Sequence, residues 1–147
     1  MHVLIAVDET PESIEAIRVA HRIFGDQTTY TVATIGEPSH HLTAMDPLGA
    51  MSYDITTLAP PDPTYPDKVA RTAVERTGID AEIIAEIGPP GPRLCLMAAE
   101  LNADVLVVGS HDRGFLSRLL DPSVQRHVAN HAPCHVLIAR HVRPDGE

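Results

Sequence analysis

With 147 residues, of which 44% are hydrophobic and 21% charged, the chain has the size and composition of a single globular domain. A formal net charge of −9 and only five aromatic residues disfavour nucleic-acid binding through a basic face or an aromatic stacking platform. The apolar runs are too short to span a membrane, and no leader segment is recognisable before the first apolar run. We therefore expect a cytoplasmic protein with no nucleic-acid partner and no membrane partner.

The N-terminal third reads as strand, helix and strand. Residues 2–7 (HVLIAV) form a near-continuous apolar run, which is typical of a strand buried on both faces. Thr10 and Pro11 predict the start of a helix, with Thr10 as the N-cap and Pro11 in the first helical position. Gly25 predicts its end. Residues 28–35 (TTYTVATI) are rich in β-branched side chains and predict the second strand.

Residues from about 36 to 66 interrupt this alternation, because they contain six prolines and no periodic pattern. A connection of this length is unusual in a compact domain and is typical of a functional or mobile loop. We expect a surface excursion with a short helical turn near Asp46–Met51. His40 and His41 are potential metal ligands, but two adjacent histidines without partners are better explained as part of a solvated loop.

The rest of the chain resumes the alternation. The predicted elements are a helix at 67–77, a strand at 80–87, a GPPGP turn, a helix at 93–101, a strand at 103–108, a helix at about 122–131 and a strand at 135–139. Five strands with helical crossovers predict an α/β fold, a parallel sheet with helices on both faces, in one domain over residues 1–147. Ligands of such sheets bind beyond the carboxyl ends of the strands. The site is therefore expected at residues 8–10 and 109–123, which follow the first and fourth strands.

Two regions carry a resemblance to a known family. VLIAVDETPESIEAIRVA (residues 3–20) and the pattern ADVLVVGSHDRG...SRLLDPSV...HAPCHVLIAR (residues 103–140) resemble the universal stress protein family. The resemblance covers nearly the whole chain, with 36–66 as the variable stretch. It implies a Rossmann-like five-stranded parallel sheet of order 3-2-1-4-5 and a homodimer. One branch of the family binds ATP through a loop of the form G-x2-G-x9-G-[S/T], and another branch has lost this loop.

Only half of that loop pattern matches here. Its three glycine positions fall on Gly109, Asp112 and Pro122, and its hydroxyl position falls on Ser123. Asp8 corresponds to the family's acidic residue that contacts the adenosine part of the ligand. The nucleotide-binding residues that the resemblance implies are Asp8, Ala33, Ile35, Gly109, His111, Arg113, Gly114, Ser123 and Val124.

The departures from the pattern oppose phosphate binding. Asp112 places a carboxylate where polyphosphate would lie, and two unit charges about 4 Å apart repel by roughly 1 kcal/mol in water and about 4 kcal/mol at an intermediate dielectric. Pro122 removes a backbone N–H donor. Asp121 is expected to cap the next helix and to substitute for the anion. These features predict a non-catalytic regulatory module with a degenerate ATP loop and at most weak nucleotide binding.

An adenine-nucleotide sensor for ATP or AMP remains the alternative, because Arg113 and the loop hydroxyls are still present. Mg²⁺ or Mn²⁺ that bridges Asp8, Asp112 and a phosphate would make such binding metal-dependent, and slow ATP hydrolysis belongs to this alternative. We predict no catalytic residue and no resident metal. His127 and His131 stand four residues apart on one helical face, a possible metal pair, but a structural role explains them better.

The last strand is the expected partner surface. If the strand at 135–140 forms the edge of the sheet, it presents an apolar strand with unpaired backbone groups. Self-pairing about a two-fold axis covers both copies at once, so we expect an antiparallel homodimer through His135–Arg140. An unknown protein partner remains possible in the regulatory interpretation. Cys95 and Cys134 lack metal-binding spacing and are expected to be reduced thiols.

Overall fold

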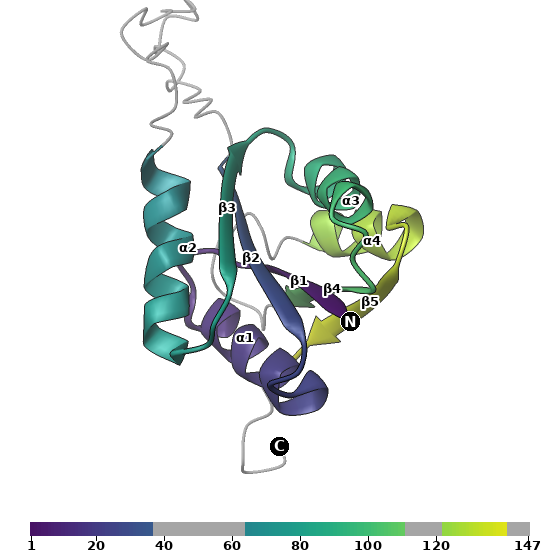
Figure 1. Cartoon of the computed structure of the whole chain (residues 1–147). Helices are drawn as coiled ribbons and strands as arrows, with labels where there is room; N and C mark the ends of the chain where they lie inside the picture. Colours follow the sequence, from purple (N-terminus) through teal and green to yellow (C-terminus); the bar gives the residue numbers. More distant parts are fainter. Residues whose placement is uncertain (37–63, 111–121, 141–147) are drawn as a thin grey trace, which may run out of the picture.

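The computed structural model describes residues 1–36, 64–110 and 122–140, and within them it has five strands and four helices (Figure 1). The strands are β1 (His2–Ala6), β2 (Thr29–Gly36), β3 (Glu82–Ile87), β4 (Val105–Gly109) and β5 (His135–Ala139). The helices are α1 (Pro11–Phe24), α2 (Thr64–Thr77), α3 (Pro90–Glu100) and α4 (Pro122–His131). The sheet is parallel throughout with the order β3-β2-β1-β4-β5, which confirms the predicted fold class.

The sheet lies between two helical layers, with α1 and α2 on one face and α3 and α4 on the other (Figure 1). Alternate residues of β1 point to opposite faces of the sheet. Val3 and Ile5 pack under α1 and α2, whereas Leu4 and Ala6 pack under α3 and α4. β1 and β4 are buried on both faces, as their continuous apolar sequences require. The carboxyl ends of these two central strands are therefore held in place by a core on each side.

Two helices begin earlier than the sequence patterns predicted. α2 begins at Thr64 and not at 67, and α3 begins at Pro90 and not at 93. Proline lacks only the N–H that a first-turn residue does not need, so the GPPGP segment supplies the first turn of α3 instead of a separate turn. The predicted turn near Asp46–Met51 and the His40–His41 pair lie outside the described residues.

No helix in the described part of the chain is long and apolar enough to cross a membrane.

Cys95 and Cys134 are free, as predicted, and both pack at the margin of the core that α3 and α4 cover. Burial raises the pKa of both thiols above the ordinary value of 9.0.

Candidate functional site at the carboxyl edge of the sheet

Asp8 occupies the junction between β1 and α1 and is 6% exposed. Its Oδ1 accepts hydrogen bonds from the Thr10 backbone N–H (2.9 Å), from the Thr10 hydroxyl and from the Ser13 hydroxyl (2.6 Å). The Asp8 backbone N–H in turn donates to Ser13 Oγ at 2.8 Å. Thr10 is the N-cap residue, as predicted, but its hydroxyl makes no capping bond and donates to the carboxylate. Asp8 thus organises the start of α1.

This network bears on the predicted contact between Asp8 and adenosine. Three donors of the chain itself already engage one oxygen of Asp8, so a ribose hydroxyl would compete with Thr10 and Ser13 for that atom. Sequence reasoning found Asp8 but missed Ser13. The signal was present, because a serine in the first turn of a helix lies close to the residues that precede the N-cap.

Ala33 and Ile35, the predicted lining of an adenine pocket, lie on β2 beside β1. The Val7 backbone N–H donates to the Ala33 carbonyl at 2.9 Å, so the end of β2 is joined directly to the segment that carries Asp8. Both side chains are buried in the core beneath α3 and α4. The structure therefore brings these three predicted residues to one edge of the sheet, with the Ala33 and Ile35 side chains inside the core.

The second junction joins β4 to α4. Gly109 is the last residue of β4, and its carbonyl accepts a hydrogen bond of 2.9 Å from Gln125 Nε2. The Ser110 backbone N–H donates to the Ala139 carbonyl at 2.7 Å, which ties the start of the loop to β5. Sequence reasoning missed Gln125, because nothing in the local pattern shows that a first-turn side chain of α4 reaches back to β4.

The remaining predicted residues divide into those that are described and those that are not. Pro122 is the first residue of α4, as predicted. Ser123 is exposed on the first turn of this helix, whereas Val124 is buried in the core. The predicted residues outside the described part of the chain are His111, Asp112, Arg113, Gly114 and Asp121, so the capping role of Asp121 stays a prediction.

A cleft of about 300 Å³ opens between α1 and α2 and extends from the first junction. Asp8, Glu9 and Thr10 line one end of it, Ile14 and Val69 form part of its apolar wall, and one face of α2 supplies the rest. The polar residues of that face are Tyr65, Lys68, Thr72 and Arg76. None of these four was predicted from the sequence, because the spacing along α2 does not reveal that α1 lies opposite.

Tyr65 of α2 lies at the Asp8 end of the cleft, near Glu9. Its side chain is 53% exposed. The pKa of Tyr65 is raised above 10.0, chiefly by partial burial and then by the negative charge of the nearby Glu9, with a smaller effect of Asp8. The phenol therefore stays protonated at neutral pH and offers a hydrogen-bond donor to the cleft.

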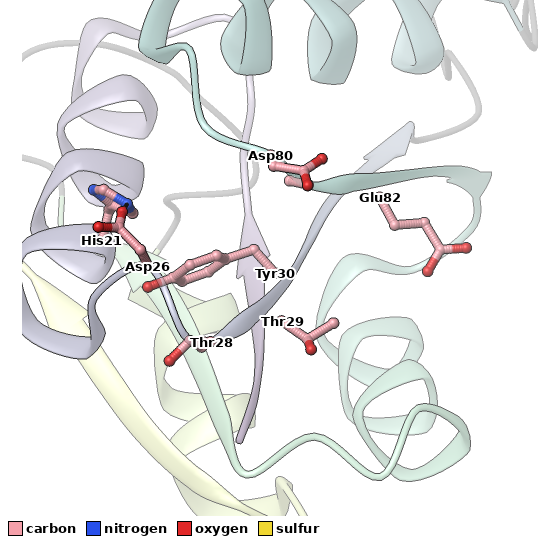
Figure 2. Close-up of a pocket in the computed structure, with 8 residues that line it drawn as sticks. His21, Asp26, Thr28, Thr29, Tyr30, Asp80 and Glu82 are labelled. Atoms are coloured by element: carbon pink, nitrogen blue, oxygen red, sulfur yellow. Dashed lines mark hydrogen bonds and ion pairs between the residues drawn. The ribbon is translucent and has the colours of Figure 1, made fainter.

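A second cleft, of about 410 Å³, lies at the opposite, amino edge of the sheet (Figure 2). Figure 2 shows His21 beside Asp26, with Glu82 apart from both. His21 Nε2 and Asp26 Oδ1 are 2.7 Å apart, and the buried Tyr30 donates its hydroxyl to the Gly25 carbonyl at 2.8 Å. These bonds hold the end of α1 against β2. The described residues contain no group of three or more metal-ligating side chains, here or elsewhere.

Comparison with known proteins identifies the class of protein. The family model of the universal stress protein family matches residues 1–140, and the chain belongs to this family. A curated relative, Universal stress protein Slr1101 of Synechocystis sp., is 35% identical over 74 residues, which are 49% of this chain and 68% of the relative.

Solved structures of the family share the fold. A universal stress protein in complex with cAMP has a TM-score of 0.60 at 24% identity, with 95% of each chain covered. An Arabidopsis thaliana universal stress protein family protein with AMP bound has a TM-score of 0.60 at 14% identity, with 99% of this chain and 94% of that chain covered. At these identities the likeness establishes the fold alone.

Proposed function

We propose that this protein is a non-catalytic, dimeric regulatory member of its family that binds an adenosine monophosphate weakly and ATP no better. The observation that carries the proposal is Pro122 at the first position of α4. A polyphosphate at a helix start needs free backbone N–H groups, and proline has none to offer. Gln125 does not replace the missing donor, because its side-chain Nε2 already donates to the Gly109 carbonyl.

The first junction supports a non-catalytic role. The hydroxyls of Thr10 and Ser13 both donate to Asp8 Oδ1. The Ser13 Oγ and Asp8 Oδ1 atoms are 2.6 Å apart, a contact that a nucleophile and its base would also make. Ser13 is fully buried, however, and its hydroxyl already exchanges two hydrogen bonds with Asp8. No substrate atom reaches it without opening of the α1 start. Asp8 and Ser13 therefore form a hydrogen-bonded pair that stabilises the start of α1.

Nucleotide binding is supported by the relatives and by the first junction together. Solved relatives hold cAMP and AMP, ligands with a single phosphate. In this chain the resemblance assigns the adenosine contacts to Asp8, Ala33 and Ile35, which lie together at the ends of β1 and β2. A monophosphate needs fewer donors than a triphosphate, so loss of the loop glycines weakens ATP binding more than AMP binding.

The dimer is supported by the exposure of β5. Among the described strands it pairs with β4 alone, and its Ile138 is 41% exposed while His135 is also exposed. An apolar strand edge is covered in both copies when two chains pair about a two-fold axis. We therefore place the homodimer contact at His135–Arg140, antiparallel across the axis.

Thermal unfolding in the presence of AMP, ADP and ATP tests the proposed function, each with and without Mg²⁺ or Mn²⁺. A ligand that binds only the folded state adds about 2.7 kcal/mol at a hundred times its Kd, which raises the Tm by several degrees for a chain of this size. We expect a small shift with millimolar AMP and no larger shift with ATP. A larger shift with ATP and metal would replace this proposal by the metal-dependent ATP sensor.

A further inference from the structure

We propose that Lys68 of α2 binds the phosphate of a nucleoside monophosphate whose ribose lies at Asp8, so that the phosphate points into the α1–α2 cleft and away from residues 109–123. This inference rests on the proposed function and deepens it. It assigns the phosphate to a part of the chain outside the family's glycine-rich loop, and it makes Lys68 a specificity-determining residue.

The shape of the cleft supports this direction. Asp8 lines both the first junction and the end of the cleft, so the two are continuous. Tyr65 lines the cleft together with Asp8 and Glu9, whose negative charges both act on its phenol, so it lies at the Asp8 end. Lys68 stands three residues further along α2, a rise of about 4.5 Å, which is roughly the length of the link between a ribose and its 5′-phosphate. The cleft volume of about 300 Å³ lies at the lower end of the range for small-ligand sites.

The charges on the α2 wall of the cleft favour an anion beside Lys68. Lys68, the single lysine of the chain, and Arg76 are exposed, and neither forms an ion pair with a residue in the described parts of the chain. Thr72 lies between them on the same helical face and offers a hydroxyl donor. In a chain of net charge −9, two unpaired cations on one wall create a local positive region that an anionic ligand would otherwise lack.

The two ends of the cleft suit different parts of one ligand. Asp8 and Glu9 are acceptors and match the hydroxyl donors of a ribose, whereas they repel phosphate. Lys68 and Thr72 are donors and match phosphate oxygens. At the other strand-to-helix junction, Pro122 has lost its N–H and α4 has no such cation in its first turn, which is Pro122-Ser123-Val124-Gln125. Among the described residues, the cationic donors that line a cleft beside Asp8 are thus on α2.

The test compares AMP with adenosine on the full chain by isothermal titration calorimetry. Lys68→Gln is expected to lower AMP affinity about five- to tenfold, because it removes an exposed charge-assisted contact, and to leave adenosine affinity unchanged. Arg76→Gln, farther from Asp8, is expected to lower AMP affinity by a smaller factor. Arg22→Gln is the matched control, since Arg22 is exposed on α1 outside the cleft. It removes the same charge and is expected to change neither affinity.

Three results would overturn the inference, and they separate it from the proposed function. If AMP binds but Lys68→Gln and Arg22→Gln affect it equally, the phosphate does not lie at Lys68 and the proposed function stands. If Lys68→Gln weakens adenosine as much as AMP, Lys68 contacts the nucleoside and not the phosphate. If neither AMP nor adenosine binds the wild-type chain, both the inference and the nucleotide part of the proposed function fall. Unchanged thermal unfolding of each variant confirms that it is folded.

Discussion

The two strand-to-helix junctions at the carboxyl edge solve the same structural problem in different ways. At the first, between β1 and α1, the Asp8 carboxylate and the Ser13 hydroxyl satisfy each other and the backbone around them. At the second, between β4 and α4, Pro122 removes a donor and Gln125 binds the Gly109 carbonyl. The first keeps an acceptor at the edge of a cleft, whereas the second loses donors. The difference explains why the edge suits a nucleoside better than a polyphosphate.

The largest expected effect concerns the first junction. Asp8→Ala removes the acceptor of three hydrogen bonds, and the buried Ser13 hydroxyl loses its acceptor. We expect the free energy of unfolding to fall by about 2 to 3 kcal/mol, measured by urea titration. Asp80→Ala is the matched control, because Asp80 is exposed and has no hydrogen bond with a described residue. A loss for Asp8→Ala no greater than for the control would show that the carboxylate does not organise α1.

The next effect concerns β5, which is bonded to the second junction through Ser110 and Ala139. Ile138→Arg places a charge on the exposed side of the edge strand and is expected to weaken the dimer by about 2 kcal/mol, roughly thirtyfold in Kd. Sedimentation velocity at micromolar concentration measures this change. Ile23→Arg, which alters an isoleucine of α1 that is 55% exposed, is the control. A wild-type chain that is already monomeric would contradict the proposed dimer.

The second junction is tested by restoring its glycines. Asp112→Gly with Pro122→Gly returns a backbone donor and removes a carboxylate, and we expect ATP affinity to rise at least tenfold, about 1.4 kcal/mol. AMP affinity is expected to change much less, since its phosphate lies elsewhere. Calorimetry with both nucleotides provides the comparison. If ATP gains nothing, these two residues do not close the junction.

A smaller effect is expected from Gln125→Ala. The Gly109 carbonyl then loses the 2.9 Å bond from Gln125 Nε2, and the free energy of unfolding should fall by about 1 kcal/mol. Chemical denaturation of this variant beside Arg126→Ala, which alters an exposed residue of α4 without a hydrogen bond or ion pair to a described residue, separates the bond from a general effect on α4. Equal losses in the two variants would argue against a specific role for Gln125.

Local patterns predicted most elements of the fold, because apolar runs and caps are local. The run in residues 2–7, the cap at Thr10 and Gly25 and the start of α4 at Pro122 are all found where expected. The strand order came from the family resemblance, since pairing between distant segments leaves no local pattern. The start of α3 was predicted too late, because its prolines indicate a turn in the sequence but form the first helical turn in the structure.

The candidate site was predicted only in part, for a physical reason. Asp8 follows a buried strand, and such a position is recognisable from the sequence alone. Lys68 and Tyr65 became candidates only from the packing of α2 beside α1. Residues 37–63 separate this helix from β2 in the sequence, so the sequence does not show that α1 and α2 are neighbours. Gln125 likewise acts across space on β4. Contacts between elements, and not the residue types themselves, were what the sequence lacked.

The most direct test of the account is the ratio of AMP to ATP affinity of the wild-type chain, measured by calorimetry with and without Mg²⁺. We predict that AMP binds at least as tightly as ATP under both conditions, because the first junction accepts a nucleoside and the second offers too few phosphate donors. ATP binding that is tenfold tighter than AMP binding would contradict this prediction. It would show that the second junction binds a polyphosphate despite Asp112 and Pro122.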